Sequence, residues 1–398
     1  TYADIIYLLA TGYKVIGKFE IGEYTSLYSF NEVEGHRFRG TIRTSNNFST
    51  RIELSAFGAY GLYDKAFKYG GACRFFITKK PRRLVHIVHK KDVEQIGISS
   101  NAYNNSGVVS SLFRRNPFNK FIFNNETRLS YTREWFHGFS SNILFRNSRI
   151  NPIGIIEFSS TDPSGSSVSV PEINSSEISI QTRFAYNEKY ISGEFDRVTL
   201  GTKFPVLEFN YGYGIPNAFG SQYEFHRLKF SVKHKIPLGI LGKLNYQFSA
   251  GKIFGNIPYP LLEVHPGNET WSYNSEAFNM MNIGEFISNE YISGKIENHF
   301  DGLFLNKFPL LKKLKWREVV AIQGVWGRLN NIESQPIELP AFSRSLENKP
   351  YLESSFGIEN IFKFLRIDVI WRLSYLNNEF DGIKVAPFGI RAKLQFDF

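Results

Sequence analysis

The sequence predicts an all-β fold, a transmembrane antiparallel β-barrel of sixteen strands with long extracellular loops and short periplasmic turns. Three observations predict it. Apolar and charged residues alternate with a period of two in segments of about ten residues. Shorter and longer connections alternate along the chain, as they do in membrane barrels. Aromatic residues, which membrane barrels gather at both membrane interfaces, make up 16% of the 398 residues.

The last segment of the chain shows the alternation most clearly. Its apolar residues fall on one face of a strand and its polar residues on the other: Ile390, Ala392, Leu394, Phe396 and Phe398 against Arg391, Lys393, Gln395 and Asp397. A soluble β-sandwich and a membrane barrel both produce this pattern, because each has one apolar and one polar face per strand. A sandwich has no reason to alternate short with long connections, so the connections favour the barrel.

The same alternation predicts the remaining strands. In chain order they are Tyr13–Glu20, Gly35–Ser45, Ser49–Tyr60, Phe67–Ile77, Arg83–Asp92, Phe123–Trp135, Phe139–Ser148, Glu177–Asn187, Ser192–Tyr213, Tyr223–Ile236, Lys243–Phe254, Tyr291–Phe300, Lys315–Gly327, Tyr351–Ile361, Arg366–Leu376 and Lys384–Phe398. The even count puts both termini on the short-turn, periplasmic side. Residues 1–12 then form a periplasmic entry segment, and residues 13–398 form the barrel in a bacterial outer membrane.

Composition argues against several other classes of protein. The net charge of +10 could suggest nucleic acid, but the basic residues are spread along the chain, so no nucleic-acid partner is expected. No apolar run reaches the ~18 residues of a spanning helix. One cysteine, unpaired histidines and the absence of a Gly-x-Ser-x-Gly elbow predict no metal, no cofactor and no enzymatic activity. A Ser–His pair brought together across strands is the alternative left open.

The charged faces of the strands predict the lining of the barrel. Basic residues share inward faces at Arg37, Arg39, Arg43, Arg227, Lys229, Lys233 and Arg372. The acidic residues on inward faces are Glu126, Glu134, Glu297 and Asp368. One interpretation is that these residues pair with one another inside a hydrated lumen. The other is a net basic pore that favours anions.

The segment 255–290, between the eleventh and twelfth predicted strands, is unusually rich in apolar residues for a loop. The candidate residues in it are Tyr259, Trp271, Met280, Met281 and Glu285, and it holds both methionines of the chain. A loop folded into the lumen explains this content, and a packed extracellular cap is the alternative.

Six stretches of the sequence resemble a known family. They are SFNEVEG at 29–35, KDVEQIG at 91–97, LFRRNP at 112–117, GKIFGNIPYP at 251–260, FNMM at 278–281 and FPLLKKLKWRE at 308–318. They look like an uncharacterised Bacteroidota outer-membrane β-barrel family, a domain of unknown function. That resemblance spans nearly the whole chain, and it implies a periplasmic region ahead of the barrel, often a carboxypeptidase-regulatory-like domain.

The barrel is also distantly similar to the BamA-like assembly and surface-antigen superfamily. That superfamily has sixteen strands and a long loop after the eleventh, where segment 255–290 lies. Its Val-Arg-Gly-aromatic signature is absent from this loop, and Phe38-Arg39-Gly40 stands in a strand instead. The apolar end Leu394, Phe396 and Phe398 resembles the signal by which assembly machinery recognises barrels.

These observations together predict a non-enzymatic barrel that is BamA-like in architecture. Its expected role is in envelope biogenesis or as a scaffold subunit of an outer-membrane complex. Its expected partners are outer-membrane lipid and lipopolysaccharide, other outer-membrane or periplasmic proteins, and the assembly machinery during biogenesis. The alternatives are a channel or transporter for small polar or anionic solutes, and a surface-exposed enzyme or adhesin.

Overall fold

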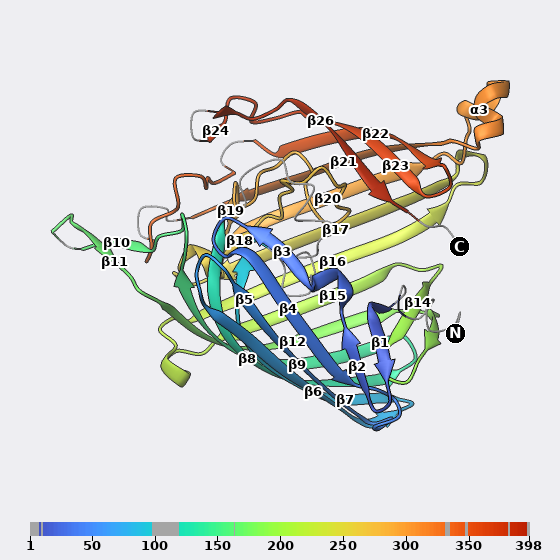
Figure 1. Cartoon of the computed structure of the whole chain (residues 1–398). Helices are drawn as coiled ribbons and strands as arrows, with labels where there is room; N and C mark the ends of the chain where they lie inside the picture. Colours follow the sequence, from blue (N-terminus) through green and yellow to red (C-terminus); the bar gives the residue numbers. More distant parts are fainter. Residues whose placement is uncertain are drawn as a thin grey trace.

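A computed structural model describes residues 8, 11–97, 119–162, 164–330, 335–346, 349–380 and 383–395. One antiparallel sheet of 18 strands curls into a barrel-shaped wall (Figure 1). The predicted all-β, antiparallel fold is confirmed. None of the helices in these ranges is long and apolar enough to cross a membrane.

The strands of the large sheet lengthen after a short N-terminal group. They are β1 (Tyr13–Ile16), β2 (Phe19–Gly22), β3 (Tyr28–Asn31), β4 (Gly35–Thr44), β5 (Ile52–Gly61), β6 (Phe67–Lys79), β7 (Arg82–Gln95), β8 (Phe121–Phe136), β9 (Phe139–Pro152), β12 (Ile173–Ala185), β15 (Val206–Gly214), β16 (Phe225–Pro237), β17 (Lys243–Phe254), β20 (Glu290–His299), β21 (Arg317–Arg328), β22 (Tyr351–Ile361), β23 (Leu365–Arg372) and β26 (Phe388–Leu394).

Short elements occupy the connections. The two-stranded pairs are β10 (Ser159–Thr161) with β11 (Ser167–Ser169), β13 (Lys189–Ser192) with β14 (Arg197–Gly201), β18 (Glu263–Val264) with β19 (Ile287–Ser288), and β24 (Glu379–Phe380) with β25 (Ile383–Lys384). The helices are α3 (Pro309–Leu314) and the 3-10 turns η1 (Tyr24–Ser26), η2 (Ala218–Gly220), η3 (Gly239–Leu241), η4 (Tyr259–Leu261) and η5 (Leu305–Lys307).

Each strand from β4 to β26 pairs with the next strand of the sheet along the chain. At the other edge, β2 and β3 share β4 as their partner, and β1 pairs with β2. β1 and β3 at one edge and β26 at the other each have a single partner, and in the described ranges no strand pairing joins the two edges.

Two predicted strands are wrong in detail. The prediction Tyr13–Glu20 is interrupted at Gly17, whose positive φ of 61° turns the chain back and makes a hairpin of β1 and β2. Together with β3, three short strands replace one, which accounts for the difference between sixteen and eighteen. The prediction Ser192–Tyr213 is broken ahead of Val206, because Pro205 offers no N–H to a ladder. Only its second part, β15, joins the large sheet.

The two faces of the sheet have opposite character. On β23, Arg366 and Asp368 are 2% and 0% exposed, whereas Trp371 on the other face is 41% exposed. A soluble sandwich would bury the tryptophan and expose the charges, because charged groups are rarely buried unless paired. The apolar face therefore points out of the barrel, as a lipid-facing surface requires.

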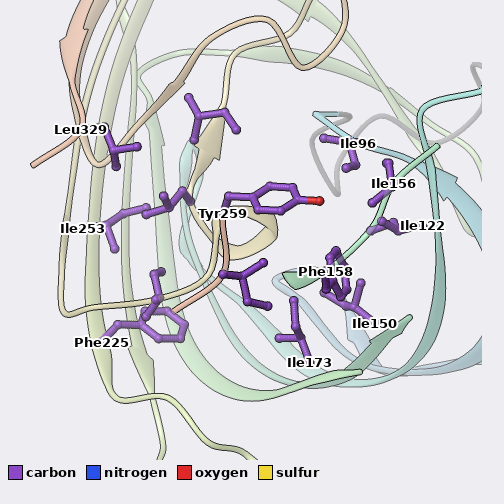
Figure 2. Packing of buried hydrophobic residues seen from close by; sticks show 14 residues of the cluster. Ile96, Ile122, Ile150, Ile156, Phe158, Ile173, Phe225, Ile253, Tyr259 and Leu329 are labelled. Carbon is purple, nitrogen blue, oxygen red and sulfur yellow. The ribbon is translucent and has the colours of Figure 1, made fainter. Parts of the chain in front are cut away.

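Most of the long connections lie at one end of the barrel, here called the loop end, and the chain termini lie at the other, the terminus end (Figure 1). The terminus end has short turns except for the connection that carries β13 and β14 and the connection that carries α3. A cluster of buried apolar side chains packs connections and strand ends together at the loop end (Figure 2). Ile122, Ile173, Phe225 and Tyr259 belong to it and are at most 8% exposed. This cluster is the main apolar core of the molecule.

Candidate functional site

The connection between β17 and β20, residues 255–289, is here called the inner loop. It turns inward and packs against the inner faces of the last strands. Of the residues that the sequence singles out in it, Tyr259, Met280, Met281 and Glu285 are at most 2% exposed, while Trp271 is 49% exposed. Its apolar content is explained by this burial, since burying a large apolar side chain contributes roughly 1.5–3 kcal/mol.

An ion pair with no solvent exposure fastens the inner loop to β23. Arg372 Nη2 donates to Glu285 Oε1 at 2.6 Å, and both side chains are 0% exposed. Glu285 also accepts hydrogen bonds from Asn378 Nδ2 at 2.9 Å and from the backbone N–H of Asn282 at 2.9 Å. A buried pair with its remaining lone pairs satisfied holds one geometry, because losing either partner leaves an uncompensated charge.

A carboxylate on β22 holds the segment around the two methionines. Glu353 accepts hydrogen bonds from the backbone N–H of Asn279 at 2.7 Å and of Met280 at 3.0 Å. The hydroxyl of Tyr351 donates to the same carboxylate at 2.9 Å, and the side-chain amide of Gln323 on β21 also donates to it. Glu353 therefore satisfies backbone donors that would otherwise be buried without partners.

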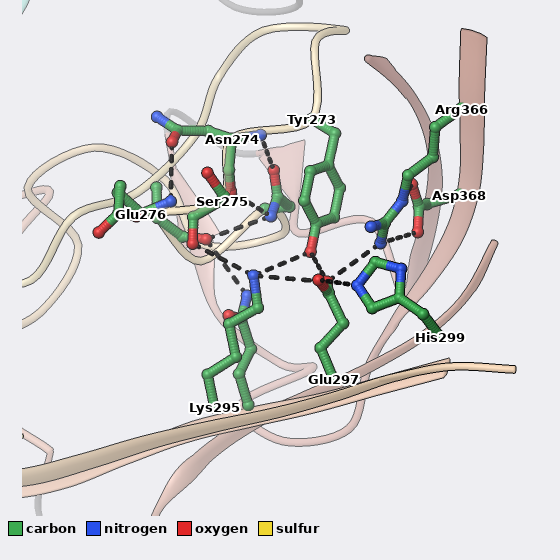
Figure 3. Close-up of polar contacts among 12 residues, drawn as sticks. Tyr273, Asn274, Ser275, Glu276, Lys295, Glu297, His299, Arg366 and Asp368 are labelled. Carbon is green, nitrogen blue, oxygen red and sulfur yellow. Dashed lines mark hydrogen bonds and ion pairs between the residues drawn. The ribbon is translucent and has the colours of Figure 1, made fainter. Parts of the chain in front are cut away.

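A third contact is a charged network around Tyr273 (Figure 3). The Tyr273 hydroxyl donates to Glu297 Oε2 on β20 at 3.1 Å. Arg366 Nη2 on β23 donates to the same oxygen at 3.1 Å and to Asp368 Oδ1 at 2.7 Å.

The network continues towards the terminus end through His299 on β20. Its Nε2 lies 3.0 Å from Glu297 Oε1, and its Nδ1 lies 3.0 Å from Glu359 Oε2 on β22. Lys295 Nζ donates to the Tyr273 hydroxyl at 3.1 Å. The inner loop thus contributes a phenol to a cluster of paired charges drawn from three strands, and each charge in it has an opposite partner.

The inner loop also reaches the outer edge of the last strand. The N–H of Tyr273 donates to the carbonyl of Ala392 at 2.8 Å, and the N–H of Ala392 donates to the carbonyl of Trp271 at 3.0 Å. This is a parallel bridge between Ser272 and Ala392. Since β26 pairs with β23 through its other edge, residues 271–273 occupy the edge that faces away from the sheet.

The part of the lumen beside the inner loop is a cavity of about 1130 Å³. It is lined by eight basic and seven acidic side chains, together with many Ser, Asn and Gln residues of β8 to β17. Lys229 pairs with Glu263 of the inner loop at 2.9 Å, and Lys233 lies 3.7 Å from Glu208. The near balance of charge favours a lumen of paired residues over a strongly basic pore.

The other predicted inward residues have partners as well, and they are distributed around the wall instead of forming one site. Arg227 lies 3.9 Å from Glu177 and donates to the carbonyl of Leu261 at 2.7 Å. The remaining contacts are Arg37 with Glu34 and Asp92, Arg39 with the ring of Phe57, Arg43 with Glu20, Glu126 with Arg128, and Glu134 with Arg197. The structure brings together Arg372 with Glu285, and Glu297 with Asp368 through Arg366.

Several residues of the site are absent from the sequence-based candidates, among them Glu353, Arg366 and Tyr273. Glu353 and Arg366 could have been found, because both fall on the charged face of an alternating strand. Tyr273 carries no such signal, because it lies in an aperiodic loop. Phe396 and Phe398 lie outside the described residues, and Leu394 is 60% exposed on the outer face of β26.

One Ser–His pair is present in the inner loop. His265 Nε2 lies 3.0 Å from Ser288 Oγ, but Ser288 is 0% exposed and so cannot meet a substrate in this conformation. Burial lowers the pKa of His265 to about 4, which keeps the ring neutral at pH 7. No group of three potential metal ligands occurs within the described ranges.

Comparison with known proteins places this sequence in a family. Residues 10–331 match the model described as the C-terminal domain of a family of unknown function, DUF5686. The chain belongs to this family. No curated protein matches the sequence of this DUF5686 domain.

Solved structures show the fold that this DUF5686 domain shares. It is similar to BamA from Haemophilus ducreyi lacking POTRA domains 1–3, with a TM-score of 0.53, 10% identity, and coverage of 95% of this chain and 71% of that one. CdiB from Escherichia coli matches with a TM-score of 0.49, 8% identity, and coverage of 91% and 60%. The BamA-like architecture, together with the outward apolar face, makes the chain an outer-membrane β-barrel.

Proposed function

We propose that this barrel acts in envelope biogenesis or as a scaffold subunit of an outer-membrane complex, without enzymatic activity. The observation that carries the proposal is the inner loop, which is fastened to β22, β23 and β26 by buried ionic and backbone contacts. A loop held in this way fills part of the lumen and leaves the rest lined by paired charges, which suits a closed scaffold better than a free passage. The barrel fold shared with BamA is consistent with this role.

The proposal includes an orientation. The loop end faces the outside of the cell, and the terminus end, with both termini, faces the periplasm. This follows the general arrangement of outer-membrane barrels, which have short periplasmic turns and longer extracellular loops. Lipopolysaccharide and outer-membrane phospholipid would then surround the apolar face, and envelope proteins would meet the barrel at its two ends.

Co-purification tests the proposal directly. The barrel, tagged within the exposed β10–β11 turn, is cross-linked in intact cells and purified in mild detergent, with an unrelated barrel of similar abundance as the control. Specific recovery of other outer-membrane or periplasmic proteins is expected. Recovery of no protein beyond those found with the control barrel would overturn the proposal.

A channel is the second candidate, and the cavity of about 1130 Å³ is the observation in its favour. In planar bilayers the scaffold proposal expects no steady conductance from the purified barrel. Steady anion-selective currents that lose their selectivity in the Arg227→Ala/Lys229→Ala/Lys233→Ala variant would establish the channel and contradict the scaffold.

A further inference from the structure

The connection between β20 and β21 carries a compact projection at the terminus end, residues 304–315, here called the α3 finger (Figure 1). It contains η5 and α3, with the sequence FLNKFPLLKKLK. Its large apolar side chains point into solvent: Leu310 is 72% exposed, Phe308 60%, Phe304 51% and Leu314 47%. The same twelve residues hold four lysines and no acidic residue.

The base of the α3 finger is fixed, so these side chains are presented on a formed structure. Glu318, which is 2% exposed on β21, accepts hydrogen bonds from the backbone N–H of Phe304 at 3.0 Å and of Leu305. Asn360 Nδ2, at the end of β22, donates to the carbonyl of Lys315 at 2.7 Å. Lys315 itself has a φ of 56° and ends α3 in the left-handed conformation.

The neighbouring turns at the terminus end also combine exposed apolar side chains with lysines. In the sheet, β16 and β17 lie on one side of the finger's strands, and β22 and β23 lie on the other. Ile240 in the β16–β17 turn is 85% exposed, and Phe362 in the β22–β23 turn is 77% exposed. Lys243 and Lys363 stand beside them. The finger is therefore the centre of a rim in which exposed apolar tips alternate with lysines.

This rim continues the lipid-facing surface of the wall. Outward residues of the adjoining strands further into the wall are apolar and exposed, namely Ile296, Val320 and Phe356 at 40–42%. Water is a poor solvent for the apolar tips, and a protein partner fits the lysines poorly, because lysine is depleted in protein interfaces. Apolar side chains interleaved with lysines are instead the composition of segments that lie in a membrane interface.

We propose that the α3 finger lies in the phospholipid leaflet at the terminus end and binds the phosphate groups of anionic phospholipids with its lysines. Phe308, Leu310 and Leu314 enter the acyl region near the headgroups, and Lys307, Lys312, Lys313 and Lys315 stay at the headgroup level, where anionic lipid attracts them. The proposal rests on the outer-membrane location and on the proposed orientation. It does not depend on the scaffold role.

A fluorescent label tests the depth of the finger. In the full-length Cys73→Ser background, the environment-sensitive dye NBD is attached at Leu310→Cys and, as a control at the same end, at Lys18→Cys in the β1–β2 turn. The barrel is reconstituted in vesicles of phosphatidylcholine with phosphatidylglycerol. A blue-shifted emission that doxyl lipids quench is expected at position 310 only. Emission at position 310 equal to that at position 18 would overturn the proposal, even if envelope proteins co-purify with the barrel.

Lipid selectivity tests the role of the lysines. Native mass spectrometry of the barrel in mixed micelles counts bound phosphatidylglycerol against phosphatidylcholine. Lys312→Gln/Lys313→Gln should lower the preference for phosphatidylglycerol by about thirtyfold, whereas the matched double variant Lys14→Gln/Lys18→Gln should leave it unchanged. Equal loss in both variants, no preference in the wild type, or a stronger preference for lipid A than for phosphatidylglycerol would each overturn the assignment.

Discussion

Removing one partner of the Arg372–Glu285 pair is the most informative perturbation of the inner loop. Arg372 donates to both oxygens of Glu285 and to the carbonyls of Met280, Ser374 and Tyr375. Both side chains of the pair are 0% exposed. Breaking a buried pair costs about 3–5 kcal/mol, because it leaves one buried charge without its partner.

The two single variants are expected to differ in cost. Glu285→Gln leaves the Arg372 guanidinium with only carbonyl partners, so we expect a loss near the upper end of that range, about 5 kcal/mol. Arg372→Met leaves Glu285 with the hydrogen bonds of Asn378 and Asn282, so we expect about 3 kcal/mol. The double variant Arg372→Met/Glu285→Gln removes both charges and should cost less than the sum of the two.

Reversible urea unfolding of the barrel in lipid vesicles measures these free energies. The matched control is Arg328→Met, which removes an Arg–Glu pair with Glu290 at 3.1 Å whose arginine is 52% exposed. Such exposed pairs contribute about 0.2–1 kcal/mol. The reasoning would be refuted if both single variants lost no more than this control, or if the double variant lost the full sum.

Three further predictions concern the face of the wall, the chain end and a hairpin. Trp371→Arg puts a charge on the lipid face and should cost about 2–4 kcal/mol near the membrane centre; an unchanged urea midpoint in lipid would contradict the outward assignment of Trp371. Phe398→Ala should lower barrel assembly, because the apolar residues Leu394, Phe396 and Phe398 resemble an assembly signal, and unchanged heat-modifiable mobility and abundance would argue against this. Burial alone would raise the pKa of Glu188, but hydrogen bonds from Arg183, Thr199 and Tyr190 lower it to about 2. Glu188 therefore stabilises the β13–β14 hairpin fully above its ordinary pKa of about 4.5, and this stability is lost as the pH falls towards 2. Amide exchange of residues 189–201 should accelerate over this pH range. Glu188→Gln should abolish the acid dependence of the exchange.

The inward and outward faces of the long strands could be predicted, because the alternation of polar and apolar residues can be recognised without knowledge of the fold. Alternation alone assigns Asp368 and Arg372 to the interior, and they are at most 2% exposed. The N-terminal strands could not be predicted in the same way. β1, β2 and β3 have four residues each, which is too few for alternation to be distinguished from chance.

The contacts of the inner loop were beyond sequence reasoning for a different reason. Its length, its apolar content and the methionine pair indicate a packed segment. The partner of each residue depends on how the loop is threaded past strands almost a hundred residues away, as in the contact of Glu285 with Arg372. Tyr273 shows this most clearly, because a solvated loop tyrosine and one bonded to Glu297 look the same in the sequence.

The bridge between Ser272 and Ala392 makes one step of folding depend on another. The backbone that meets the outer edge of β26 comes from the connection between β17 and β20, far earlier in the chain. Docking of residues 271–273 therefore supplies partners to the outer edge of β26 and joins two distant parts of the chain. Shortening this connection would differ from trimming an ordinary surface loop, since it would leave the N–H and carbonyl of Ala392 without partners at an edge where the membrane offers no water to replace them.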